Sequence, residues 1–155
     1  MKAKHLKKAK TYIWVLSIGL LLCGITAYPL QLELAFINSY AKHMPLALAL
    51  WLKQVNLALE QTNTNYPFLP YGTDWLAFAH LAIALIYLAA LKNLAQNSWL
   101  IQAGMLIAAL LIPHALISGY YRGIPFFWQL IDCQFGLIAF LVLYLCQTEL
   151  TKHHK

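Results

Sequence analysis

Four long hydrophobic stretches constrain the fold of this chain more than any other feature of the sequence. They cover about residues 12–32, 75–91, 99–119 and 128–146. Each is close to the roughly 20 apolar residues that a helix needs to cross a bilayer. A crossing segment must be helical, because lipid offers no partners to the backbone N–H and C=O groups. The pattern predicts an all-α polytopic membrane protein, a four-helix bundle.

Composition supports that class and predicts one membrane domain over residues 1–155. Hydrophobic residues make up 61% of the chain and charged residues 10%, whereas soluble domains carry roughly 25% charged residues. A soluble chain of this length could not hide so much apolar surface in one core. The first stretch is longer than the apolar part of a signal peptide and no A-x-A site follows it, so we expect a retained helix.

The basic residues are unevenly distributed, and this predicts the orientation. The net charge of +6 comes largely from the two termini, whereas only Lys42, Lys53 and Arg122 lie on the other side of the predicted spans. Because cytoplasmic segments are enriched in Lys and Arg, both termini are expected in the cytoplasm. The basic tails adjoin hydrophobic segments, which favours anchoring to lipid headgroups and gives no reason to expect a nucleic-acid partner.

The longest connection, about residues 33–74, is expected on the outer side and has structure of its own. Within residues 45–61, Leu48, Leu52, Val55 and Leu59 recur at helical spacing, and Pro45 suits a helix start. We expect an amphipathic helix here that lies in the outer interface or caps the bundle. The prolines and the glycine of QTNTNYPFLPYGTD predict a shaped loop before the second span.

Five ionisable residues lie in or beside the spans: Asp74, His80, His114, Arg122 and Asp132. Such groups are costly at membrane depth and usually mark a functional pocket or a paired polar network. At 1.5 Å per helical residue, all five are expected near the outer face. We therefore predict that they converge in one polar layer.

Two of the five are candidate substrate-binding residues. Arg122 can hold an anionic group, or its side chain can simply extend to the lipid headgroups. Asp74 can contact a substrate, or it can cap the N-terminus of the second span. Both alternatives are open from the sequence.

The other three are candidate catalytic residues. His80 or His114 can transfer a proton, and Asp132 is expected to pair with Arg122 or with a histidine. The structural alternatives are that His114 repairs the helix bend at Pro113 and that His80 is a lone histidine whose hydrogen bonds are satisfied.

No motif indicates a metal or a cofactor, and none is expected. The sequence has no HxxxH or HExxH spacing, no P-loop and no dinucleotide fingerprint. The cysteines stand at unrelated spacings in hydrophobic stretches, which favours a packing role: Cys23, Cys133 and Cys146.

Two segments, NTNYPFLPYGTDWLAFAH and SGYYRGIPFFWQLIDCQFG, resemble those of uncharacterised bacterial four-helix integral membrane proteins. That resemblance covers most of residues 63–143 and implies a bacterial inner membrane. A fainter likeness is to VanZ-like membrane proteins, which pair an Asp–His motif at one helix with an Arg–Asp–Gly motif at another. The residues that match those motifs here are Asp74, His80, Arg122, Asp132 and Gly136.

Two functions follow from these observations. The first is an outward-facing polar pocket that binds an amphiphile or lipid headgroup, with the question of catalysis left open. The alternative is a non-enzymatic accessory or structural subunit, as a homo-oligomer or with another membrane protein. Small residues such as Gly19, Gly104 and Gly136 would permit close helix packing within this chain or with a partner.

Overall fold

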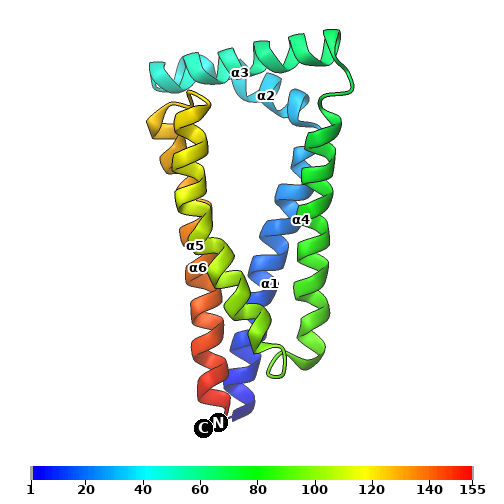
Figure 1. The fold of residues 1–155 in the computed structure, drawn as a ribbon, viewed down its shortest axis with the longest axis vertical. Helices are drawn as coiled ribbons and strands as arrows, with labels where there is room; N and C mark the ends of the chain where they lie inside the picture. The colour runs from blue at the N-terminus through cyan, green and yellow to red at the C-terminus, as the bar shows by residue number, and fades with distance from the viewer. Residues whose placement is uncertain (1, 155) are drawn as a thin grey trace. The chain divides into compact units, whose positions relative to one another are not determined.

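The computed structural model describes residues 2–154 and confirms the all-α class, since no strand occurs in that range. Two short 3₁₀ helices interrupt the connections (Figure 1). The elements in chain order are α1 (Lys2–Ala27), α2 (Leu30–Ser39), η1 (Ala41–His43), α3 (Leu46–Asn65), α4 (Tyr71–Ala90), η2 (Leu91–Asn93), α5 (Ser98–Tyr121) and α6 (Phe126–His154).

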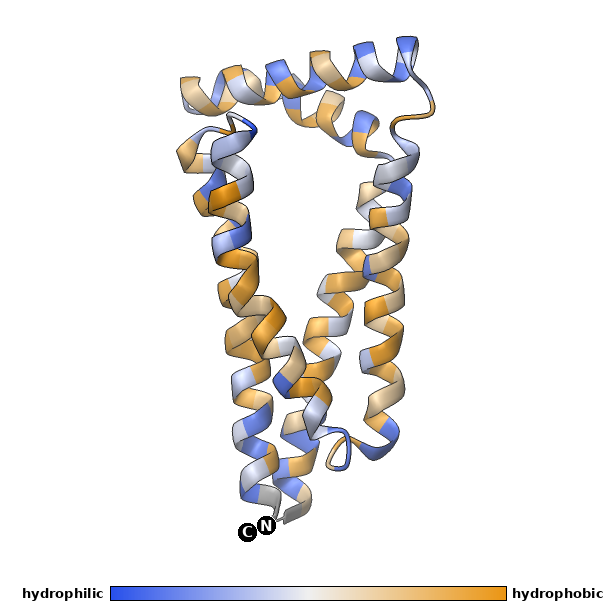
Figure 2. Cartoon of the chain, viewed as in Figure 1, coloured by the Kyte–Doolittle hydropathy of each residue, from blue (hydrophilic) through white to orange (hydrophobic). Residues whose placement is uncertain are grey.

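Four of the helices, α1, α4, α5 and α6, are long and apolar enough to cross a membrane. Hydrophobic residues cover most of their length, and hydrophilic residues gather toward the chain termini and the connections (Figure 2). Many large apolar side chains are exposed, for example Leu106 at 62% and Ile107 at 68% on α5. Soluble proteins rarely expose so much contiguous apolar surface. By the length and composition of these helices, the chain is an integral membrane protein.

The ends of α1 and α6 lie well outside the apolar stretches. α1 begins at Lys2 and α6 continues to His154, whereas the sequence predicted spans of about residues 12–32 and 128–146. Lys, Gln, Glu and Leu are good helix formers, so polarity marks where an apolar span ends but does not stop the helix.

The other end of the first predicted span is wrong. α1 ends at Ala27, and a turn at Tyr28 and Pro29 separates it from α2, a helix that the sequence did not predict. A proline ring has no N–H and clashes with the preceding turn, so it interrupts a helix. The carbonyl oxygen of Pro29 then accepts from the N–H of Glu33 at 3.0 Å and starts α2.

The described chain forms two compact units. Unit 1 comprises Met1–Ile18 and Ala84–Lys155, and unit 2 comprises Gly19–Ile83. The boundaries of the units fall inside α1 and α4, so each of these helices contributes residues to both units. The single domain expected over residues 1–155 stays a prediction. The two units are described separately below.

In unit 1, the first half of α1 packs against the last half of α6. The thiol of Cys146 donates to the carbonyl oxygen of Ala9 at 3.5 Å, so the two buried faces meet. The packing role expected of Cys146 and Cys133 is confirmed, because both are buried, whereas Cys23 is exposed. The buried residues of these two faces are Ala9, Ile13 and Ser17 on α1 and Leu143, Cys146 and Leu150 on α6.

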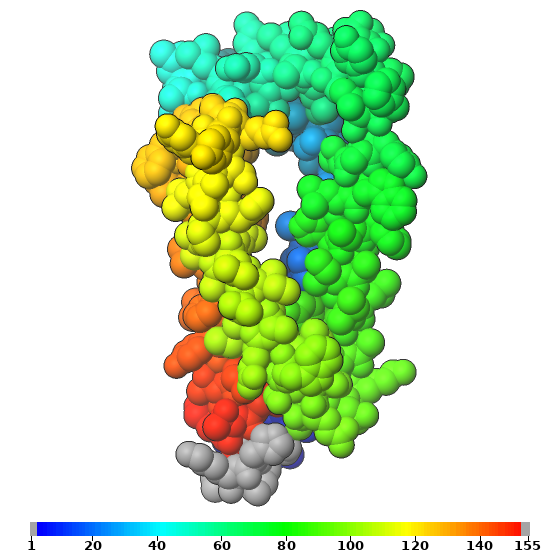
Figure 3. Space-filling view, in the orientation of Figure 1, coloured from blue at the N-terminus to red at the C-terminus, as the bar shows by residue number. Residues whose placement is uncertain are grey.

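In unit 1, helices α5 and α6 lie against each other, and glycines allow their close approach. An added Cβ at Gly136 would lie 2.8 Å from the backbone oxygen of Ala108 on α5. At Gly104, the Tyr87 hydroxyl group occupies the space that a Cβ would need. Side chains of α5 lie directly against those of α6 in the space-filling view (Figure 3). By contrast, a Cβ at Gly19 would meet nothing within 4 Å among residues 2–154.

Unit 2 confirms the amphipathic helix expected over residues 45–61. It is α3, which begins directly after Pro45 and packs on α2. The amide nitrogen Nδ2 of Asn38 on α2 donates to the Leu52 carbonyl oxygen at 3.3 Å. Leu52 is buried, whereas Lys53 and Glu60 are exposed, as the pattern predicted.

Candidate functional site

The connection between α5 and α6 has a defined backbone geometry. Gly123 has a φ of +64°, a left-handed conformation that glycine adopts without steric penalty. Its N–H donates to the Tyr120 carbonyl oxygen at 3.2 Å, and the N–H of Ile124 donates to that of Gly119 at 2.9 Å. These two bonds form the Schellman motif that ends many helices. Pro125 follows, and α6 begins at Phe126.

Gln129 fixes this connection from the side of α6. Its side-chain Nε2 donates to the Ile124 carbonyl oxygen at 2.7 Å. The same side chain lies over Gly119, where an added Cβ would approach it to 2.6 Å. Gln129 is only 7% exposed, so both its amide and its stem are held in place. The start of α6 is thereby set against the end of α5.

A hollow of about 310 Å³ lies beside this connection, within unit 1. His114 and Ser118 line it from α5 and Arg122 from the C-cap directly after that helix, and their spacing of four residues places them along one side. Asp132 enters the same hollow from α6. Leu111, Ala115 and Ile124 supply apolar walls. The structure thus brings together three of the five ionisable residues singled out in the sequence.

The predicted pairing of Asp132 with Arg122 or with a histidine is wrong for Arg122 and for His114, and pairing with His80 stays a prediction. Among the described side chains of residues 3–152, the ion pairs are those of Glu149, and neither Arg122 nor Asp132 takes part. His114 Nδ1 instead lies 3.4 Å from the hydroxyl oxygen of Ser118. The exposed Arg122 guanidinium group therefore keeps its donors available for an anion.

The remaining two residues belong to unit 2. The His80 ring bonds within its own helix, with Nδ1 2.8 Å from the Leu76 carbonyl oxygen, which supports its structural alternative. Asp74 is exposed and is not an N-cap. Its N–H donates to the Pro70 carbonyl oxygen at 3.1 Å, because α4 already begins at Tyr71. The convergence of all five residues in one layer stays a prediction.

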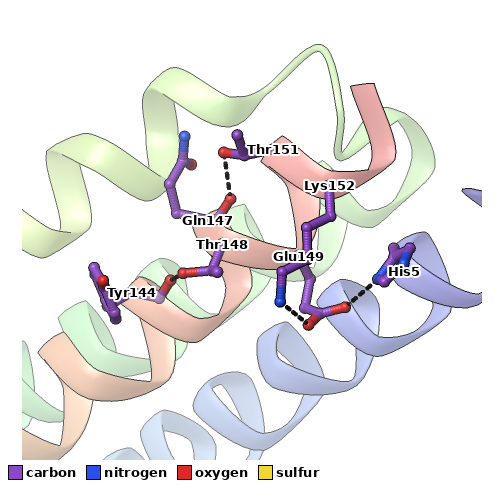
Figure 4. Close-up of polar contacts among 7 residues, drawn as sticks. All are labelled: His5, Tyr144, Gln147, Thr148, Glu149, Thr151 and Lys152. Carbon is purple, nitrogen blue, oxygen red and sulfur yellow. Dashed lines mark hydrogen bonds and ion pairs between the residues drawn. The ribbon is translucent and has the colours of Figure 1, made fainter. Parts of the chain in front are cut away.

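A polar cluster at the other end of unit 1 was not predicted (Figure 4). The Glu149 carboxylate accepts from His5 Nδ1 at 2.7 Å and from Lys152 Nζ at 3.3 Å. His5 stands on α1 and Glu149 on α6, 144 positions apart. Only the three-residue spacing of Glu149 and Lys152 could have been read from the sequence.

Gly123→Ala is expected to destabilise the α5–α6 connection, because an alanine in the left-handed region costs about 1–2 kcal/mol. Asparagine tolerates this conformation better, so Gly123→Asn should lose less. Thermal unfolding in detergent, followed by circular dichroism, measures both variants. Equal stability of the wild type and the alanine variant would contradict the conformation assigned to Gly123.

Among the described side chains of residues 3–152, no group of three or more His, Cys, Asp or Glu is placed to hold a metal ion. Comparison of the chain with protein-family models, with curated proteins and with solved structures found no match.

Proposed function

We propose that this integral membrane protein binds the anionic headgroup of an amphiphile in the hollow between α5 and α6. The observation that carries the proposal is the placement of Arg122 beside Ser118 and His114 in a hollow with apolar walls, with no ion pair to Arg122 among the described side chains. A guanidinium group is suited to phosphate and carboxylate, which it can bind through two parallel hydrogen bonds.

The surroundings favour an amphiphile over a fully polar solute. The hollow is at the lower end of the size range of ligand sites, which suits a headgroup. Next to it, α5 exposes large apolar side chains such as Leu110 and Ile117. An acyl chain could lie along these side chains while the headgroup contacts Arg122. Membrane lipids are the proposed partners.

Each ionisable residue that lines the hollow has a separate proposed role. Arg122 binds the anion, and Asp132 orients the bound headgroup through a hydrogen bond. The His114 imidazole lies beside the Ser118 hydroxyl group and is the proposed proton-transfer group of the hollow. No reaction is assigned to them. Asp74 and His80 are not among the residues that line this hollow, so substrate binding by Asp74 and proton transfer by His80 are not part of this proposal.

We further propose that the hollow faces the outer side of a bacterial inner membrane and that both termini are cytoplasmic. The distribution of Lys and Arg supports this orientation. In unit 1, the His5–Glu149 contact places the ends of α1 and α6 together. Asp132 stands about 26 Å from Glu149 along α6, at 1.5 Å per residue, close to the thickness of the hydrocarbon core.

Arg122→Gln is expected to weaken the binding of phosphatidylglycerol about tenfold, the equivalent of one charge-assisted contact of about 1.4 kcal/mol. Binding of phosphatidylcholine with the same acyl chains should change little. Native mass spectrometry of the purified full chain, titrated with each lipid, measures both affinities.

Lys53→Gln is the matched control, because Lys53 is exposed and lies on the same predicted side of the membrane. It removes one positive charge that is not among the residues lining the hollow. A specific site requires that Lys53→Gln bind phosphatidylglycerol like the wild type. Equal losses in both variants would show a general charge effect and contradict the proposal.

The alternative function, an accessory subunit of a membrane complex, draws support from Gly19. This glycine is exposed on α1 with open space beside it among residues 2–154, and such positions allow a second helix to approach closely. Stoichiometric recovery of another subunit during detergent purification would favour this alternative. A lone chain with bound anionic lipid would favour the pocket.

A further inference from the structure

We propose a second binding site, in unit 2, that takes the ammonium group of a phospholipid headgroup. A hollow of about 260 Å³ is lined by four aromatic side chains and one carboxylate. Its chemistry is opposite to that of the Arg122 hollow, so the inference goes beyond the function proposed above. The lining residues are Tyr28, Tyr71, Asp74, Trp75 and Phe78.

The aromatic residues form walls at several angles. Tyr71, Trp75 and Phe78 follow one another along one face of α4. The Tyr71 and Trp75 rings are 6.0 Å apart and nearly perpendicular at 86°, and those of Trp75 and Phe78 are 6.2 Å apart at 88°. Tyr28 adds a wall from the turn between α1 and α2. Edge-to-face packing fixes the orientation of these rings.

The electrostatics of this hollow select a cation. The face of an aromatic ring is negative, and Trp is the strongest cation–π partner. Asp74 is the one charged residue of the lining, and no ion pair neutralises it among residues 2–154. An ammonium group can contact the aromatic rings and the carboxylate together. A hard metal ion would instead need several oxygen ligands, which a mostly aromatic lining does not supply.

A neighbouring hollow extends the site toward polar groups. It has a volume of about 270 Å³ and shares Tyr28 and Asp74 with the first. Gln31, Asn63 and Thr73 also line it. The side-chain oxygen Oδ1 of Asn63 is buried without a hydrogen-bond partner among the described residues, so it can accept from an ammonium N–H. These acceptors favour a primary ammonium group, as in phosphatidylethanolamine.

The position along the helix suits a lipid. The site lies in the first two turns of α4, one of the four candidate spans, and interfacial aromatic residues sit at headgroup depth. Exposed Trp and Tyr side chains at the end of a span usually form an interfacial aromatic belt and do not by themselves indicate a binding site. The carboxylate among the rings distinguishes a binding site from a belt, and it is the residue to test.

Asp74→Asn and Trp75→Leu are each expected to lower the affinity for phosphatidylethanolamine about fivefold, the effect of losing about 1 kcal/mol. Trp75→Phe, which keeps an aromatic face, should lose less. Binding of phosphatidylglycerol should be unchanged in all three variants. Native mass spectrometry of the full chain with each lipid measures these affinities.

Two matched controls make the result decisive. Glu60→Gln removes an exposed carboxylate from α3 of the same unit, and Trp99→Leu removes an exposed Trp at the start of another span. Neither should alter phosphatidylethanolamine binding. Equal losses for Trp75→Leu and Trp99→Leu would leave only an aromatic belt, and equal losses for Asp74→Asn and Glu60→Gln only a general charge effect. Either result overturns the proposal.

Discussion

Gly136→Leu is expected to force α5 and α6 apart and to lower the free energy of unfolding by about 3 kcal/mol, the upper end of the usual effect of overpacking. A Cβ at position 136 would lie 2.8 Å from the Ala108 carbonyl oxygen and 3.3 Å from a Leu111 methyl carbon. The Ala108 oxygen is part of the α5 backbone and cannot rotate away. Reversible unfolding in detergent, followed by tryptophan fluorescence, measures the loss.

Gly19→Leu is the control for this variant. It makes the same substitution inside a candidate span, at a position where an added Cβ meets nothing within 4 Å among residues 2–154. Both variants gain the same helix propensity on losing a glycine, so the difference between them isolates the clash. Similar unfolding curves for the two would contradict the close approach of α5 and α6 at Gly136.

Leu143→Ala is expected to lower the free energy of unfolding by about 2 kcal/mol through the cavity that it leaves. Leu143 is 2% exposed, and its side chain lies against Gly104 on α5. Lipid tails are as apolar as this core, so transfer of the side chain contributes little. The loss of packing contacts remains, which places the effect at the lower end of the range for Leu→Ala. The same unfolding assay measures it.

Leu137→Ala provides the comparison on the same helix. Leu137 is 56% exposed, so its truncation leaves no cavity and should change the free energy of unfolding by about 0.5 kcal/mol or less. A loss at Leu137 that matched the loss at Leu143 would mean that the buried face of α6 has been assigned incorrectly.

The spans could be predicted because each carries its own signal, but their ends could not. An apolar run of about 20 residues identifies a crossing helix without reference to the rest of the chain. The charged residues before Tyr12 belong to α1 all the same, because a helix ends where its backbone bonding ends. Pro29 was the local signal for the end of α1, and weighting it more heavily would also have separated α2 from the first span.

The candidate site was predictable to the extent that its geometry is local. The four-residue spacing of His114, Ser118 and Arg122 follows from one helix, and the short RGIP connection brings Asp132 near them. Whether Arg122 and Asp132 come into direct contact depends on the relative position of α5 and α6. Gln129 and Gly119 fix that position through tertiary packing, which cannot be read from the spacing of residues in the sequence. The His5–Glu149 contact joins distant positions, and a single sequence holds no trace of it.

Because α1 packs on α6, unit 1 can complete its folding only after α6 has been synthesised. α1 precedes α6 on the chain, so the face formed by Ala9, Ile13 and Ser17 is synthesised long before Cys146 and its neighbours can cover it. At translation rates of about 5–20 residues per second, the wait is on the order of 10 s. During that interval the buried face of α1 must contact lipid or an insertion factor. The packing of unit 1 cannot be completed until translation has nearly reached the last turns of α6.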